Sequence, residues 1–261
     1  MLSTPLYVKI TYMGVFLVKT MIIADIHGYV HLLNQAIAHF EGLSEDTKLV
    51  FLGDYIDRGP SSLECLQVVK ILQEKYPNRV TTLKGNHEEL FEQFLLTGVS
   101  FSSNGIWETI KSFYPYEEVP KPIKNFVYQY KEYASRIKTD YPLLVDYLNT
   151  LPLYYMDDNI IAVHAGITED TLNRKDSEFF LWAREEYFVQ QNTFNKPIIS
   201  GHTPIPNLVK YLEGYTIPYH KNNIVTTPDN KYYIDGGVFS TKKLNTVIFE
   251  NGVLIDNPVF N

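Results

Sequence analysis

The sequence predicts an α/β protein whose first half forms a parallel β-sheet. Apolar runs that are too short for helices recur about 30 residues apart, which is the length of one βαβ unit. Stretches with apolar residues at helical spacing lie between these runs. Each run also ends in polar side chains that can bind a metal. The resulting β-α-β-α-β order is typical of parallel strands whose connecting helices pack on the faces of the sheet.

The first half of the chain supplies three expected strands and three expected helices. The strands are residues 21–24, 48–52 and 79–83. The helices are residues 29–40, 61–75 and 87–96. Pro60 and Ser61 are typical start signals for the second helix. Ligands bind at the carboxyl ends of strands in such sheets, so the polar residues at these ends are candidates for a functional site.

Residues 100–150 differ from the first half because they are rich in Tyr and Lys and contain scattered Pro. We expect a helical insertion here, with helices at residues 125–137 and 142–150. Pro142 suits the first turn of a helix. The sequence leaves open whether this insertion forms one wall of a substrate groove or a solvated accessory region.

The last part of the chain returns to strand patterns. We expect strands at residues 160–163, 197–200, 231–234 and 246–250. Residues 213–230 contain the Gly, Pro and Asn residues that are typical of a loop. The chain length suits one sizeable α/β domain, and we predict a single domain over residues 1–261.

The composition is that of an ordinary globular protein, with 45% hydrophobic and 20% charged residues. The net charge of −7 and the lack of clustered Lys and Arg argue against a nucleic-acid partner. An acidic chain that binds an anionic substrate should concentrate positive charge in one place. Metal ions are one source of that charge.

Two features concern the location of the protein. The apolar run within residues 1–20 is interrupted by Lys9 and Thr11 and stops at Lys19, so it is too short and too polar to span a bilayer. It also lacks the clear features of a signal peptide. The single cysteine, Cys65, excludes an internal disulfide and lies in a helical pattern, where we expect a packed thiol. We therefore expect a cytoplasmic protein with no membrane partner.

Six short polar motifs follow one another along the chain. They are Asp25-Ile26-His27-Gly28, Gly53-Asp54-Tyr55-Ile56-Asp57-Arg58-Gly59, Gly85-Asn86-His87-Glu88, His164-Ala165-Gly166, Leu181-Trp182-Ala183-Arg184 and Gly201-His202-Thr203-Pro204. Any one of them has a plain structural explanation, such as a helix cap or a tight turn. Their occurrence in this order at predicted strand ends favours a functional site.

The spacing of the motifs brings their ligand-type side chains together. Asp25 and His27 are two residues apart at a strand end, where they point the same way. Asp54 and Asn86 follow the next two strands, so both arrive at the same edge of the sheet. The later strands can bring two further ligands to that edge, namely His164 and His202.

The residue types indicate the class of metal. Carboxylate, imidazole and amide oxygen without thiolate suit Mn, Fe, Zn or Mg, and they do not suit a closed Cys-rich zinc site. Two ions about 3.5–4 Å apart need a shared anionic ligand. Asp54 is the candidate for that ligand, because a carboxylate can use both of its oxygens.

This set of motifs resembles the phosphoprotein-phosphatase (PPP) family within the calcineurin-like metallophosphoesterases, and it is most similar to the small bacterial serine/threonine phosphatases. The resemblance extends from about residue 21 to about residue 250. It implies an α/β fold of two packed mixed β-sheets flanked by helices, in a four-layer αββα arrangement. It also implies that the active site lies at the strand ends.

The resemblance assigns roles to individual residues. The implied metal ligands are Asp25 and His27 for a first ion, Asp54 for both ions, and Asn86, His164 and His202 for a second ion. The implied general acid is His87, oriented by Asp57. The implied phosphate-binding residues are Arg58 and Arg184. The implied cofactors are two divalent metal ions, Mn²⁺ by resemblance, with Fe and Zn as alternatives.

The implied reaction is hydrolysis of a phosphate monoester by a hydroxide that bridges the two ions and attacks phosphorus in line. Such a mechanism needs no protein nucleophile, and the sequence has neither a G-x-S-x-G motif nor a Cys-centred phosphate loop. The planar guanidinium groups of the two arginines match phosphate. A serine alkoxide is a poor leaving group, so a proton from His87 matters.

Three functions compete at this point. The first is a serine/threonine protein phosphatase that acts on phosphoproteins or phosphopeptides, with phosphotyrosine as a further substrate. The alternative is a symmetrical dinucleoside-polyphosphate (diadenosine tetraphosphate) hydrolase, and the third is a metal-dependent binding protein without turnover. Thr203-Pro204 after His202 removes the second histidine that nucleases and many phosphodiesterases of the superfamily use. Asp57 supplies an acid that the dinucleotide hydrolases typically lack, which favours the protein phosphatase.

Overall fold

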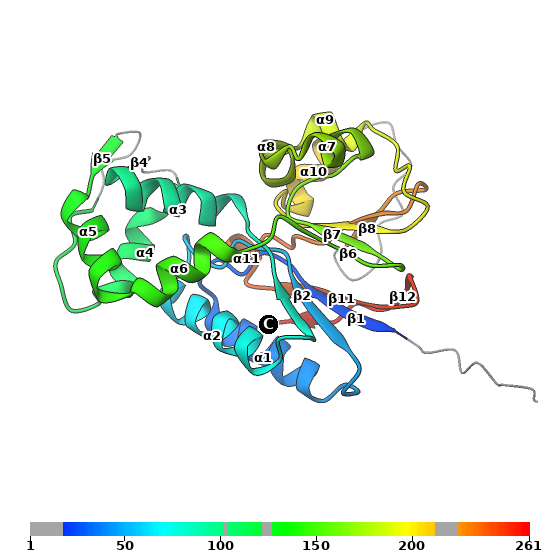
Figure 1. The fold of residues 1–261 in the computed structure, drawn as a ribbon, viewed down its shortest axis with the longest axis horizontal. Helices are drawn as coiled ribbons and strands as arrows, with labels where there is room; N and C mark the ends of the chain where they lie inside the picture. The colour runs from blue at the N-terminus through cyan, green and yellow to red at the C-terminus, as the bar shows by residue number, and fades with distance from the viewer. Residues whose placement is uncertain (1–17, 102–103, 122–126, 212–223) are drawn as a thin grey trace, which may run out of the picture.

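The computed structural model describes residues 18–101, 104–121, 127–211 and 224–261 (Figure 1). Most of the apolar run at residues 1–20 and much of the expected loop at residues 213–230 lie outside the described residues. Within the described part of the chain, no helix is long and apolar enough to cross a membrane.

The first β-sheet is centred on β1 (Lys19–Ile23). Its other strands are β2 (Lys48–Phe51), β3 (Val80–Thr82), β11 (Leu244–Glu250), β12 (Val253–Asp256) and β13 (Val259–Phe260). The order across the sheet is β12-β11-β1-β2-β3, with β13 also paired to β11. β1, β2 and β3 are parallel, whereas β11 runs antiparallel to β1. The three parallel strands therefore end at the same edge of the sheet.

The second β-sheet has the order β6-β7-β8-β10-β9. Its strands are β6 (Tyr154–Met156), β7 (Ile161–Val163), β8 (Ile198–Ser200), β9 (Val225–Thr226) and β10 (Lys231–Tyr233). β7, β8 and β10 are parallel, and the two outer strands run antiparallel to their neighbours. This sheet also presents the carboxyl ends of three parallel strands at one edge.

The two sheets pack face to face. Alternate side chains of β1 point to opposite faces. Met21 and Ile23 pack in a core with α1 (Val30–Glu41) and α2 (Ser62–Lys75). Ile22 packs instead in a core shared with residues of β7 and β8. A strand that is buried on both faces needs a continuous apolar run, which is the pattern that the sequence has here.

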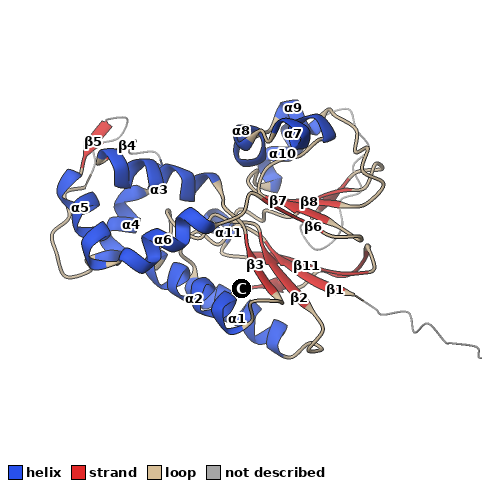
Figure 2. Ribbon diagram, in the orientation of Figure 1, coloured by secondary structure: helices blue, strands red, loops and turns tan. Residues whose placement is uncertain are grey.

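Short helices cover the outer face of the second sheet (Figure 2). They are α7 (Glu169–Arg174), α8 (Ser177–Trp182), α9 (Glu185–Phe188) and α10 (Ile205–Tyr211). Ile161 and Val163 of β7 pack in one core with Phe180 of α8. The layers therefore follow the order helix, sheet, sheet, helix, which confirms the predicted αββα fold.

The expected insertion lies in a group of helices beside the sheets (Figure 2). This group contains α3 (Asn86–Thr97), α4 (Ile106–Phe113), α5 (Lys131–Asp140) and α6 (Pro142–Thr150), with a two-stranded antiparallel sheet of β4 (Val99–Phe101) and β5 (Val127–Gln129). Ile110, Phe113 and Ile137 belong to the same core as Met21 and Ile23. The insertion is therefore an integral part of the main core and not a solvated accessory region.

The predicted start of the helix at residues 125–137 is wrong. Residues 125–126 lie outside the described residues, the next three residues form β5, and the helix begins only at Lys131. β-branched and aromatic residues such as Val127 and Tyr128 favour a strand when a partner is present. The partner is β4, with Val99 opposite Gln129. A local helical period cannot reveal this pairing, because the partner strand is distant in sequence.

The remaining expected helices and strands are confirmed, and their observed ends differ from the expected ends by no more than two residues. α6 matches the expected residues 142–150. One further correction concerns the loop expected at residues 213–230, because Val225 and Thr226 form β9. The sequence prediction has no counterpart for several elements, which include β4, α4, β6, α7, α8, α10, α11 (Val238–Thr241), β12 and β13.

Candidate metal centre

The six predicted metal-ligand residues come together where the strand ends of the two sheets meet. They are Asp25 and His27 after β1, Asp54 after β2, Asn86 after β3, His164 after β7 and His202 after β8. Each of the six is buried, with at most 5% of its surface exposed. Both sheets therefore contribute side chains to one enclosed polar cluster.

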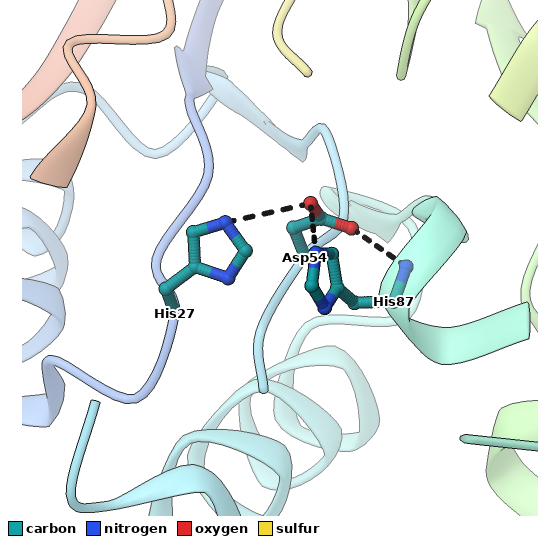
Figure 3. Close-up of side chains that lie close together, drawn as sticks. All are labelled: His27, Asp54 and His87. Atoms are coloured by element: carbon teal, nitrogen blue, oxygen red, sulfur yellow. Dashed lines mark hydrogen bonds and ion pairs between the residues drawn. The ribbon is translucent and has the colours of Figure 1, made fainter. Parts of the chain in front are cut away.

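Asp54 lies between His27 and His87 (Figure 3) and also faces His164. Its Oδ2 atom is 3.5 Å from Nε2 of His27 and 3.9 Å from Nε2 of His87. Its Oδ1 atom is 3.5 Å from Nε2 of His164, which comes from the other sheet. Asp54 forms one group of ligand atoms with His27 and His87 and another with Asp25 and His164, each within 4.8 Å. One carboxylate therefore belongs to two groups of possible ligand atoms, and these groups place Asp25 with His164 and not with His27.

The donor atoms around His164 fit a cation. Nδ1 of His164 donates a hydrogen bond to the Leu52 carbonyl oxygen at 2.9 Å, so the neutral ring carries its lone pair on Nε2. That Nε2 atom lies 2.9 Å from Oδ1 of Asn86, which can only accept. Nδ1 of His202 lies within 3.1 Å of both atoms, and Nε2 of His202 has no hydrogen-bond partner among the described residues. Nε2 of His164 and Oδ1 of Asn86 are both acceptors, and their close approach becomes favourable when a cation lies near both atoms.

The histidines of the cluster are held in the form that binds metals. Nδ1 of His27 donates to the Ile56 carbonyl oxygen at 2.8 Å, which directs its Nε2 lone pair toward Asp54. Burial lowers the pKa of His27, His164 and His202, so these rings are neutral at physiological pH. A metal ligand must be deprotonated, and a hydrogen bond from the other ring nitrogen orients it.

The buried carboxylates also favour a cation. Burial, Asp235 and Asp54 together raise the pKa of Asp25 well above its usual range. Burial and the charge of Asp54 raise the pKa of Asp235 to about 6. Carboxylates this close repel one another when ionised, and a bound cation relieves that repulsion.

His87 and Asp57 form a hydrogen-bonded pair at the edge of the cluster. Nδ1 of His87 donates to Oδ2 of Asp57 at 2.7 Å. Burial lowers the pKa of His87, but Asp54 and the hydrogen bond to Asp57 outweigh it, and the pKa is raised. Arg58 reaches the same place, with Nη1 at 2.8 Å from Nε2 of His27 and Nη2 at 2.9 Å from Nε2 of His87. The predicted proton donor and its orienting residue therefore meet as expected.

A cavity of about 660 Å³ opens beside the cluster. Arg58 and Arg184 both line it, together with His27 and His202. Arg184 precedes α9, and its Nη1 donates to Oγ1 of Thr203 at 2.7 Å. The two predicted phosphate-binding residues therefore reach the same cavity as the candidate metal ligands.

Several residues of the cluster have a strained backbone. Five non-glycine residues adopt left-handed conformations, with φ of 46° at His27, 54° at Asp54, 67° at Asp57, 66° at Arg58 and 64° at His202. Each such residue costs about 1–3 kcal/mol and persists only where the surrounding structure enforces it. Strain of this kind gathers at functional sites, and motif spacing does not reveal it.

The sequence interpretation underestimated two acids. Glu88, expected only to favour a helix start, is fully buried and accepts hydrogen bonds from the amides of Asp54, Tyr55 and Gly85 at 2.7–2.9 Å. It therefore fixes the turn that carries Asp54. Asp235 is likewise buried, and it lines the cavity. Its position directly after the strand pattern at residues 231–234 is the signal that could have identified it.

The two-sheet fold and the cluster of buried His and Asp side chains define the class of a metal-dependent phosphoesterase. The chain belongs to the calcineurin-like phosphoesterase family, whose model matches residues 18–240. The family is one of metallophosphoesterases, which implies divalent metal ions, and the groups that share Asp54 are the candidate ligands.

Part of the chain is also similar to a protein phosphatase. A segment of 67 residues is 46% identical to the serine/threonine-protein phosphatase SIT4 of Candida albicans. This segment covers 24% of the chain and 21% of that relative. The similarity thus spans about a fifth of the relative's length.

Two solved structures share the fold over nearly the whole chain. A putative diadenosine tetraphosphatase is 14% identical, with a TM-score of 0.51 and coverage of 93% of this chain and 94% of that one. The cold-active protein-tyrosine phosphatase of a psychrophilic Shewanella is 15% identical, with a TM-score of 0.57 and coverage of 93% and 80%. At these identities the likeness shows the fold alone.

Proposed function

We propose that this chain is a dinuclear metal-dependent phosphomonoesterase and that it acts as a serine/threonine protein phosphatase. The observation that carries the proposal is the place of Asp54 in two groups of ligand atoms. Beside these groups lie a His–Asp pair and two arginines that line one cavity. The partial similarity to SIT4 supports the protein-phosphatase assignment.

The proposed metal ligands divide into two sets that share one residue. Asp25, His27 and Asp54 would hold one ion, and Asp54, Asn86, His164 and His202 would hold the other. Two divalent ions, when bound, supply an activated water and neutralise charge on the phosphoryl oxygens. Mn²⁺ is our proposed metal, with Fe and Zn as alternatives, because this oxygen and imidazole set suits all three.

The arginines supply the rest of the positive charge. Arg58 and Arg184 line the cavity, so their guanidinium groups can hold the phosphoryl oxygens in a fixed orientation. Arg58 reaches this position from a strained turn, and Arg184 is held by Thr203. The chain as a whole has a net charge of −7, which makes a local concentration of positive charge important for an anionic substrate.

His87 is the proposed proton donor. The carboxylate of Asp57 holds Nδ1, and Nε2 lies 2.9 Å from Nη2 of Arg58 and 3.9 Å from Oδ2 of Asp54. When the P–O bond to a serine or threonine oxygen breaks, the proton on Nε2 transfers to that oxygen, and a neutral alcohol leaves. The raised pKa keeps more of the ring protonated near neutral pH.

Three broader assignments belong to the same proposal. We propose one catalytic unit over residues 1–261, in which the helices of residues 100–150 form part of the main core. We propose a phosphoprotein or phosphopeptide as the partner in solution. A single, buried cysteine fits a reducing compartment, so we propose action in the cytoplasm.

One alternative has a specific observation in its favour. The putative diadenosine tetraphosphatase covers 93% of this chain and 94% of its own in a similar fold. A cavity of about 660 Å³ is also large enough for part of a nucleotide. The alternative function is therefore hydrolysis of dinucleoside polyphosphates at the same metal centre.

A side-by-side measurement separates these functions. We would determine kcat/KM of the Mn²⁺-loaded protein on a phosphothreonine peptide and on diadenosine tetraphosphate, with His87→Asn as the matched control. We expect a clear preference for the peptide. A clear preference for the dinucleotide would overturn the protein-phosphatase assignment while leaving the metal centre in place, and turnover of neither substrate would overturn both functions.

A further inference from the structure

The helical insertion contacts the His87–Asp57 pair directly. Thr109 lies in α4 and is fully buried. Its hydroxyl donates a hydrogen bond to Oδ1 of Asp57, while Oδ2 of the same carboxylate accepts from Nδ1 of His87. The three side chains therefore form a continuous chain from the insertion to the proposed proton donor.

The backbone of Asp57 depends on the same hydroxyl. The Asp57 amide donates to Oγ1 of Thr109 at 3.1 Å and to Oγ of Ser62 at 3.0 Å. Thr109 and Ser62 also contact each other at 3.1 Å. Asp57 has a left-handed backbone with φ of 67°, a conformation that persists only when its surroundings fix it. Thr109 thus contacts both the backbone amide and the carboxylate of one strained residue.

Helix α4 is placed closely enough for this contact to be specific. Gly105 precedes the helix with φ of 91°, and a Cβ atom there would lie 2.7 Å from the Arg58 amide nitrogen. Ser112, one turn after Thr109, accepts a hydrogen bond from the Leu63 amide at 3.0 Å. Ile110 and Phe113 pack in the main core. The position of Thr109 is therefore fixed from both ends of the helix.

We propose that Thr109 is a positioning residue for the proton donor, and that this is a role of the helical insertion in the reaction. The inference rests on the proposed general-acid function of His87. A donor on Oδ1 fixes the rotation of the Asp57 carboxylate, so that Oδ2 stays aligned with Nδ1 of His87. The ring is then held with Nε2 toward the leaving oxygen. Thr109 is fully buried and is not among the residues that line the cavity, so its effect passes through Asp57.

The chemistry of the leaving group provides a selective test. A serine alkoxide needs a proton as the P–O bond breaks, whereas p-nitrophenolate is stable without one. General acid catalysis contributes about 10²–10⁴-fold to a rate where it is needed. A misplaced donor therefore slows hydrolysis of a phosphoserine peptide more than hydrolysis of p-nitrophenyl phosphate. A change that only loosens the fold or the metal centre slows both alike.

The experiment compares Thr109→Val, which removes the hydroxyl, with Thr109→Ser, which keeps it. We expect Thr109→Val to lower kcat on the phosphoserine peptide by about 10-fold or more, as part of the general-acid contribution, with KM and bound metal unchanged. The p-nitrophenyl phosphate rate should change by less than about twofold, since it needs no donor. Thr109→Ser should restore most of the lost peptide activity.

Two controls separate the possible failures. Ser112→Ala removes an anchor of α4 that does not touch Asp57, and we expect an unchanged ratio of the two rates. His87→Asn should show the largest split between the substrates. If His87→Asn shows no split, the general-acid proposal itself fails. If it shows the split and Thr109→Val does not, only the role of Thr109 is overturned.

Stability is measured alongside activity. If Thr109→Val does not fold, the Thr109→Ala and Thr109→Ser pair gives the same comparison, because one lacks the hydroxyl and the other retains it. Equal losses on both substrates in every hydroxyl-free variant would show a purely structural residue and overturn the inference. A Thr109→Ser enzyme as slow on the peptide as the hydroxyl-free variants would also overturn it.

Discussion

Oδ1 of Asp54 lies 3.5 Å from Nε2 of His164, although Asp54 follows a strand of the first sheet and His164 follows a strand of the second. This contact joins the two sheets at the edge that carries the candidate metal ligands. Because Asp54 also faces His27 through its other oxygen, a change at this one carboxylate should affect both candidate ion positions.

Asp54→Asn should therefore remove both metal binding and activity. The amide keeps the shape of the side chain but loses the charge that two cations would share. We expect metal affinity to fall by more than about 100-fold, since changes in residues that only support a metal ligand cost 10–100-fold. Metal content after dialysis, together with turnover, tests this. Asp46→Asn, a change at an exposed acid, is the control and should bind metal normally.

His87→Asn should separate chemistry from metal binding. Asparagine cannot supply the proton, so we expect kcat on a phosphoserine peptide to fall by about 10²–10⁴-fold. The proposed ligand sets do not include His87, so metal content should stay at the wild-type level. Near-wild-type turnover by this variant would remove the general-acid assignment. Loss of bound metal would instead make His87 a ligand, as its place in one group with His27 and Asp54 allows.

Gly85→Ala tests how closely the backbone approaches the centre. A Cβ atom at Gly85 would lie 2.2 Å from Oδ1 and 2.4 Å from the amide nitrogen of Asp54, so the carboxylate must move. We expect weaker metal binding and lower activity, together with a loss of stability of about 1–3 kcal/mol from overpacking. Metal titration and urea unfolding measure the two effects. Gly42→Ala, where the nearest atom is 3.4 Å away, should leave metal binding unchanged.

Asp157 should contribute pH-dependent stability away from the centre. Burial opposes its ionisation, but hydrogen bonds from Tyr155, the Asn159 and Ile160 amides and Lys48 outweigh it and hold its pKa below the ordinary value of 3.8. A carboxyl group whose pKa is lower in the folded state stabilises the protein above its unfolded pKa and loses that contribution as the pH falls through its folded pKa. The stabilisation is therefore present at neutral pH.

We expect Asp157→Asn to lower the free energy of unfolding by roughly 1 kcal/mol at neutral pH. The difference from wild type should shrink as the pH falls from about 4 through the lowered pKa of Asp157, below which both chains carry a neutral side chain. Urea unfolding at several pH values measures it. Asp158→Asn, at the exposed neighbouring position, is the control. A difference that grows toward acid pH would contradict the assigned direction of the pKa.

The sequence predicted the centre better than its surroundings. Asp25, Asp54 and Asn86 each follow a short buried strand, and one strand period and one βαβ length place them at a common edge. His164 and His202 follow strands in the same way, so the same argument extends to the second sheet. The local pattern was sufficient to group these side chains, because parallel neighbouring strands end at the same edge of a sheet.

The contacts that support the centre could not be predicted in this way. Thr109 contacts Asp57 because helix α4 packs against the turn that holds Asp57, although the two residues are about 50 positions apart in the chain. A local pattern of apolar residues cannot predict such a contact. Glu88 has the pattern of a helix start, and its three amide partners depend on a turn with a strained residue at Asp54. The pairing of β4 with β5 was missed for the same reason, because the pairing of strands distant in sequence is a tertiary interaction.

The central claim is that Asp54 joins two ion positions that together drive phosphomonoester hydrolysis. The most direct test is a titration of the metal-free chain with Mn²⁺, in which bound metal per chain and p-nitrophenyl phosphate turnover are followed together. We predict that turnover is absent without metal, appears as two ions bind per chain, and is lost again on chelation. Full turnover by the metal-free chain, or turnover that saturates with a single bound ion, would contradict the claim.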